Sequence, residues 1–141
     1  MDFTFRFLTA AGEYLQAQNV GKWTPPYSAT DFVVSVDAFG TSDRAIMLNT
    51  YPVQDDSTTD SILGLQLWIR GAPKDRQGAK SVADRAFDSL HDLQRVEWGG
   101  IPIVRVWRQQ QASHGPDANG REEISADYYV QHTRAGAHRR D

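Results

Sequence analysis

Hydrophobic residues recur along this chain with two different spacings, one typical of helices and one typical of strands. Spacings of three and four residues predict a first helix over 2–18 and a second, clearer helix over 75–93. The apolar stripe of the second helix is centred on Phe87, which we expect to be fully buried. This stripe consists of Ala79, Val82, Ala83, Ala86, Phe87, Leu90 and Leu93.

Strands are predicted over 45–51, 62–70, 101–108 and 122–133. The segment 45–51 is bounded by turn residues, and apolar and polar residues alternate cleanly over 62–70. In the second of these strands the leucines face one way, while Trp68 and Arg70 face the other. The third strand is expected to place Ile103 and Arg105 on one side and Val106 on the other. The polar stretch 54–60 joins the first two strands, which should therefore pair in antiparallel fashion. The short run 32–36 fits either a strand or a helical turn.

Residues 109–121 contain Gly, Pro and Asn but no hydrophobic residue larger than alanine, so this segment is expected to be a structureless loop. The resulting order is helix, strand, strand, helix, strand, strand. It favours an α/β (α+β) fold with a single mixed sheet of about four strands and both helices packed on that sheet. We expect one domain over 1–141, with 133–141 as a C-terminal tail.

The composition restricts the class of protein. The chain has 141 residues, a formal net charge of -3 and no Cys. This charge does not favour nucleic acid as the main ligand, because nucleic-acid-binding surfaces are usually basic. The absence of Cys excludes a disulfide scaffold, a Cys-based zinc site and thiol catalysis. The N-terminal segment is too charged for a signal peptide, and no stretch is apolar enough to span a membrane, so we expect a cytoplasmic protein.

Three segments resemble catalytic or metal motifs, and each lacks a feature that its chemistry needs. Residues 71–81 join a strand to a helix, but their glycine and lysine spacing does not match a phosphate-binding loop. Residues 55–66 lack the glycine and the glutamate of a calcium loop. Ser113 and His114 lie in a segment too irregular to hold a triad, and the histidines show no metal spacing. We therefore predict no catalytic residue, no metal site and no cofactor.

Several short strings resemble those of one known family when they are taken in order. They include Gly64-Leu-Gln-Leu-Trp-Ile-Arg-Gly71, the helix segment 83–91, and Asp117-Ala-Asn-Gly-Arg121 followed by Asp127-Tyr-Tyr-Val130. Further matches are Asp43-Arg-Ala-Ile46 and Tyr51-Pro-Val53. Together these strings span most of the chain from about residue 40 to 140. They are similar to the minor capsid, or tail-terminator, proteins of long-tailed phages, especially phages that infect actinobacteria.

This resemblance implies a structural virion protein rather than an enzyme. Such a subunit forms a ring, expected to be a hexamer, on the last layer of the tail tube. Its implied partners are further copies of itself, the tail tube protein and the head–tail connector proteins. DNA would pass through the ring lumen without sequence-specific binding. The implied location is the tail or neck of the virion, with assembly in the host cytoplasm. A head-completion (neck connector) protein and a small cytoplasmic enzyme remain as alternatives.

Contacts between copies should use exposed strand edges and the charged side of the second helix, because rings are built from heterologous contacts. Trp68 either packs under the first helix or contacts a partner. The loop 109–121 is expected to be a docking arm. The candidate contact residues are Trp68, Arg70, Arg76, Lys80, Asp84, Arg85, Asp88, Ser113, His114, Asp117, Asn119 and Arg121.

Overall fold

The computed structural model describes residues 2–140 of the chain, which form two helices and one six-stranded sheet. The elements are α1 (Phe3–Ala17), β1 (Val33–Val36), β2 (Ala45–Asp55), β3 (Asp60–Pro73), α2 (Arg76–Leu90), β4 (Gln94–Trp98), β5 (Ile101–Pro116) and β6 (Arg121–Thr133). The strand order across the sheet is β1-β2-β3-β6-β5-β4. The β1–β2 pair is parallel and the other neighbouring pairs are antiparallel, including the expected β2–β3 pair.

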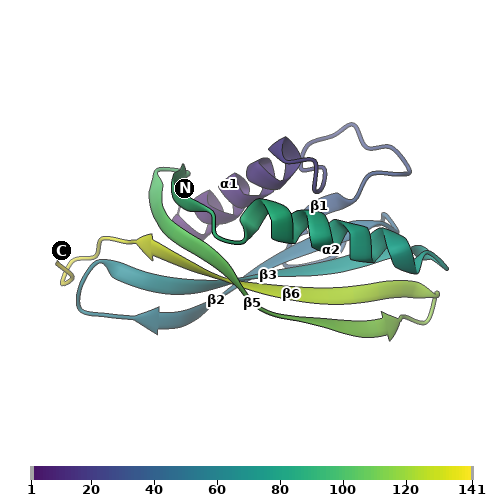
Figure 1. Cartoon of the computed structure of the whole chain (residues 1–141). Coiled ribbons are helices and arrows are strands. Elements are labelled where there is room, and N and C mark those ends of the chain that lie inside the picture. The colour runs from purple at the N-terminus through teal and green to yellow at the C-terminus, as the bar shows by residue number, and fades with distance from the viewer. Residues whose placement is uncertain (1, 141) are drawn as a thin grey trace.

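Both helices lie on the same face of the curled sheet, and no helix of the described chain lies on the opposite face, here called the open face (Figure 1). The core fills the space between these two layers. Phe7 and Leu15 of α1, Val82 of α2, and Leu67 and Ile69 of β3 are each almost completely buried there. Burying one such side chain contributes roughly 1.5–3 kcal/mol, so the two apolar stripes suffice to hold the helices on the sheet.

Local hydrogen bonds mark both ends of the α2 helix. The Asp75 carboxylate accepts a hydrogen bond from the Gly78 N–H at 3.0 Å, which satisfies one of the free amides at the helix start. The helix ends at Leu90, before the predicted residue 93. Beyond it the Asp92 N–H donates to the Val106 carbonyl at 2.7 Å, and the chain joins the edge of the sheet.

The expected sheet of about four strands is too small. The run 33–36 is the strand β1, and β4 is a strand that the alternation of residues did not reveal. Four of the five β4 residues are at least partly exposed, because β4 lies at the edge of the sheet and has little apolar pattern. The added strands leave the fold class unchanged, with two helices covering one face of a mixed sheet.

The expectation of a structureless loop over 109–121 is wrong. Here β5 and β6 form a long hairpin in which Gln110 pairs with Asp127 and Ser113 with Ile124, so that only a short turn at 117–120 remains. Residues 109–114 are polar or small, and they are held in the sheet by their pairing with β6. Shortening this segment would therefore remove half of a paired strand rather than a mobile arm.

Two side-chain assignments are also corrected. An irregularity in the β5–β6 register between Ile103 and Arg105 reverses the alternation, so Val106 enters the core and Arg105 does not. Phe87 is only half-buried and stacks on His91, with the guanidinium of Arg108 lying 4.1 Å from its ring centre. It lies on a flank of α2 where β5 is the last strand of the sheet.

The segment after β6 is attached to the turn between β2 and β3. The Arg139 guanidinium donates to the carbonyl oxygens of Thr58 at 2.6 Å and Asp60 at 2.8 Å, and to Ser61 Oγ at 2.6 Å. Residue 140 also forms an isolated β-bridge with Thr58. The tail as expected from the sequence includes residue 141, which lies outside the described residues.

Candidate assembly surfaces

The turn between β5 and β6 is held in one shape by a single carboxylate. Asp117 accepts hydrogen bonds from the N–H groups of Asn119 and Arg121, both at 2.9 Å, and from Arg121 Nε at 2.8 Å. The bonds from Arg121, together with its positive charge, lower the pKa of Asp117. Gly120 has a φ of +75°, a conformation that glycine adopts without strain. The turn is therefore rigid before any partner binds.

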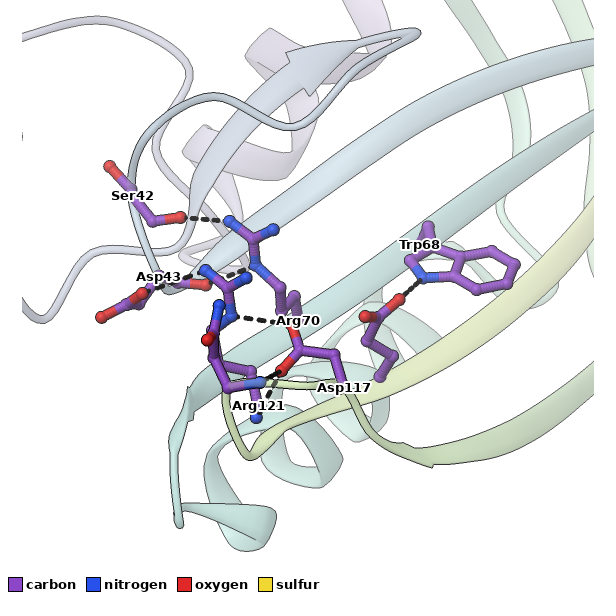
Figure 2. Close-up of polar contacts among 8 residues, drawn as sticks. Ser42, Asp43, Trp68, Arg70, Asp117 and Arg121 are labelled. Carbon is purple, nitrogen blue, oxygen red and sulfur yellow. Dashed lines mark hydrogen bonds and ion pairs between the residues drawn. The ribbon is translucent and has the colours of Figure 1, made fainter.

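Two arginines connect this turn to the segment that precedes β2, as Figure 2 shows. Arg121 Nη1 donates to the Asp43 carboxylate at 3.1 Å. Arg70 is only 7% exposed and donates to the carbonyl oxygens of Ser42 at 2.6 Å and Asp43 at 3.0 Å. Its guanidinium also lies 4.2 Å from the ring centre of Phe39. Burial lowers the pKa of Arg70. We call the turn 117–120 and these contacts the hairpin end of the sheet.

Trp68 lies on the open face, next to the hairpin end. Its indole N–H donates to Glu123 of β6 (Figure 2), and its ring stacks on His114 with centroids 4.5 Å apart. His114 Nε2 lies 2.8 Å from Ser125 Oγ. Trp68 therefore does not pack under α1, and packing there, one of the two alternatives from the sequence, is wrong. Partner contact by Trp68 stays a prediction.

A second polar group extends the open face away from the hairpin end. Asp127 accepts hydrogen bonds from Tyr51 Oη at 3.0 Å and from Gln66 Nε2 at 3.1 Å. Burial and the bond to Asp127 raise the pKa of Tyr51 to about 12. Tyr51, Gln66 and Asp127 are not among the contact residues predicted from the sequence. The alternation of Glu123, Ser125 and Asp127 with the apolar residues of β6 is the sequence signal that places Asp127 on the open face.

The charged candidates on α2 lie on the other side of the molecule. Five exposed side chains, Arg76, Lys80, Asp84, Arg85 and Asp88, cover the solvent side of this helix. Within residues 2–140, none of these five forms an ion pair with another residue of the chain. Their charges are therefore available to a partner.

The structure thus divides the twelve predicted contact residues into two groups. Trp68, Arg70, Ser113, His114, Asp117, Asn119 and Arg121 come together from three strands at and beside the hairpin end, whereas the five α2 residues lie on the helix side of the sheet. Ser113 itself donates to the buried Glu122 carboxylate at 3.0 Å, and Asn119 is exposed in the turn.

The cavities of the described chain do not bring together a cluster of metal-binding side chains. Two cavities, with volumes of about 430 and 400 Å³, lie at opposite ends of α1. The first is bordered by Phe3, Arg6 and Arg134, and the second by Gln16, Lys22 and Arg85. Among the described residues no three His, Asp or Glu side chains are placed to hold a metal ion. No helix in that part of the chain is long and apolar enough to cross a membrane.

A six-stranded sheet with two helices on one face defines a small α+β protein, and the charges along α2 form no ion pair with any described residue. Comparison with known proteins identifies the kind. The family model described as "Bacteriophage tail terminator protein" matches residues 14–134, which is most of the chain. The chain belongs to this family, and it is a structural tail terminator protein of phage-like virions.

The fold also occurs in a solved virion. A chain in the structure titled "Virion of native gene transfer agent (GTA) particle" superimposes with a TM-score of 0.57 at 12% sequence identity. The similarity covers 71% of this chain and 78% of that one. No curated protein matches the sequence. At this identity the similarity establishes the fold, whereas the family match establishes the role.

Proposed function

We propose that copies of this protein close into a hexameric ring on the end of the tail tube, where the ring stops tube growth and meets the head–tail connector. The observation that carries this proposal is that the exposed charges of α2 form no ion pair with any described residue, so this side of the helix can meet a different surface of the next copy. Contacts between two different surfaces are heterologous, and heterologous contacts that close by rotation form rings.

In this proposal the charged side of α2 contributes to the contact between neighbouring copies. Arg85 and Asp88 are both exposed there and carry opposite charges. The hairpin end is the docking surface toward the tube or the connector, because Asp117, Arg121 and Arg70 fix its shape in advance. DNA passes through the lumen without sequence-specific contacts. Assembly takes place in the host cytoplasm, and the proposal assigns the protein no catalytic step and no cofactor.

The mass of the purified protein in solution and electron micrographs of assembled tails test the proposal. We expect rings at the tube end, and we expect the reversed pair Arg85→Glu with Asp88→Arg to impair ring closure while the circular dichroism spectrum stays unchanged. The matched control exchanges Ser81, on the same helix, for Ala. Rings of the reversed variant in wild-type yield would exclude this side of α2 from the contact. A monomer that assembles only on the portal connector would instead favour the head-completion protein.

A further inference from the structure

Among the described residues, the outer edge of β5 has no partner strand over its second half. β4 pairs with β5 only from Ile101 to Arg105, and Leu93 and His91 continue the edge contacts as far as Arg108. From residue 109 to 116, no strand of the described chain lies on that side of β5. The sheet is therefore stepped, with β4 covering one half of this edge and leaving the other half open.

The open half of β5 has free backbone groups at defined residues. The N–H groups of Val106 and Arg108 point away from β6, where they donate to Leu93 and His91. Further along β5, Gln110 to Ser113 pair in unbroken register with Asp127 to Ile124. The alternation of an antiparallel ladder then directs the N–H and C=O groups of Gln111 and Ser113 away from β6. Residues 109–114 contain neither Pro nor a Lys, Arg, Asp or Glu residue, which are the residues that protect natural sheet edges from pairing.

The helix above this edge extends past the last strand. Phe87, on the α2 flank, is only half-buried, and it contacts Arg108, the residue at which the free half of β5 begins. A strand added beside Gln111 would continue the sheet on this flank of α2. The free edge and the half-buried phenylalanine thus indicate the same missing strand.

The opposite edge of the sheet offers a strand of similar length. β1 pairs with β2 only at residues 45–48, so the outer side of β2 from Asn49 to Asp55 has no partner strand among the described residues. The same alternation directs the backbone of Thr50 and Pro52 outward. Pro52 has no N–H, and at this outward position it costs no hydrogen bond within the sheet.

We propose that the free half of β5 in one copy pairs with the free half of β2 in the next copy, so that the sheet continues from copy to copy around the ring. The inference rests on the proposed ring. In two copies placed edge to edge in the same orientation, β5 and β2 run antiparallel, because three antiparallel pairs separate them within one sheet. Their charges are complementary: residues 108–116 contain Arg108 and no acid, and residues 49–56 contain Asp55 and Asp56 and no base.

Pro52 weakens the proposed pairing between β5 and β2. It removes one outward donor from the centre of the β2 edge, which weakens pairing between free copies. Copies that are already bound side by side on a tube end pair in spite of this loss. Binding to the tube raises the effective concentration of each edge next to its neighbour. Ring formation should therefore depend on the tube end in the wild-type protein.

The first experiment removes one donor from the β5 edge. Gln111→Pro places a proline at an outward position, as Pro52 is placed in β2, and Gln111→Ala is the matched control that keeps the N–H. Purified proteins are added to tail tubes, and rings are counted by electron microscopy. We expect at least a tenfold loss of rings for Gln111→Pro and wild-type yield for Gln111→Ala. Wild-type yield from Gln111→Pro would overturn the edge pairing and leave the ring intact.

The second experiment does not depend on whether the proline variant folds. The chain has no Cys, so introduced cysteines are its only thiols. Thr50→Cys combined with Ser113→Cys, oxidised on tail tubes, should give a ladder of disulfide-linked copies on a non-reducing gel. Thr50→Cys combined with Gln18→Cys is the control and should give none. Equal ladders, or no ladder from the edge pair on tubes that carry rings, would overturn the inference. Absence of any wild-type ring would overturn the proposed function instead.

Discussion

Gly12 lies in the middle of α1 at a point where Trp23 folds back against the helix. A Cβ atom built on Gly12 would lie 2.4 Å from Cε3 and 2.6 Å from Cδ2 of the indole. Carbon atoms do not approach this closely, so Gly12→Ala must displace the ring. The backbone around Trp23 resists the movement, because the N–H groups of Trp23 and Thr24 donate to Gln16 Oε1 at 2.8 and 2.9 Å.

Two effects of opposite sign decide the result of this substitution. In an unobstructed helix interior, alanine is more stable than glycine by about 1 kcal/mol. Forcing an extra carbon into an occupied site costs about 1–3 kcal/mol, and the half-buried indole loses contact as well. We expect a net loss of about 1–2 kcal/mol for Gly12→Ala. In a Trp23→Ala background the obstruction is gone, and the same substitution should stabilise the protein by about 1 kcal/mol.

Urea unfolding followed by far-ultraviolet circular dichroism measures this cycle without relying on tryptophan fluorescence, which the background variant alters. The sign of the Gly12→Ala effect is the diagnostic quantity. If Gly12→Ala stabilises the wild-type protein as much as it stabilises the Trp23→Ala variant, the indole does not occupy the space over Gly12, and the placement of the segment 19–31 against α1 is refuted.

Three further predictions concern stability. Phe87→Ala should cost about 1–2 kcal/mol rather than the 3–5 kcal/mol of a fully buried phenylalanine, since the ring is only half-buried; urea unfolding checks this. Tyr128 is completely buried, and its hydroxyl has no hydrogen-bond partner among the described residues. Tyr128→Phe should therefore raise the unfolding free energy by about 1 kcal/mol, and an equal loss would mean that the hydroxyl has a partner. Burial lowers the pKa of His132 below its usual value near 6.5. The unfolded chain therefore binds the proton more readily, and stability should fall as the pH drops below about 6.5. His132→Gln should flatten this part of the melting-temperature profile, and an unchanged slope would assign it to other groups.

The elements that could be predicted from the sequence are those whose residues alternate between the core and another environment. The stripe of Val82, Ala86 and Leu90 predicts α2, and the alternation through Leu65, Leu67 and Ile69 predicts β3, because each of these residues faces the buried layer. β4 and the second half of β5 could not be predicted in this way. They are held by backbone hydrogen bonds at the edge of the sheet, where side chains such as Gln109 remain exposed and carry no pattern.

The candidate surfaces were predictable to a similar degree. The charges on α2 follow directly from helical spacing around an apolar stripe, and the structure places all five on the solvent side. The contacts between Arg70 and the carbonyl oxygens of Ser42 and Asp43 join residues 27 and 28 positions apart, and no local pattern encodes them. The prediction that Phe87 is fully buried is wrong for a related reason. Helical spacing gives the direction of a side chain, but it does not reveal where the sheet beneath the helix ends.

In the proposed function the hairpin end is a docking surface, and its short turn suits that role because it is already ordered. An unstructured loop that orders on contact loses about 1–2 kcal/mol of backbone entropy for each residue fixed, and this loss subtracts from the affinity. In this protein the Asp117 carboxylate fixes the turn, and Arg121 and Arg70 attach the segment 39–43 beside it before any partner is present. A partner that meets this end of the sheet therefore binds a surface already in its final shape. The side chain of Asn119 remains exposed in this surface, and in the proposed function it contributes to the choice of partner.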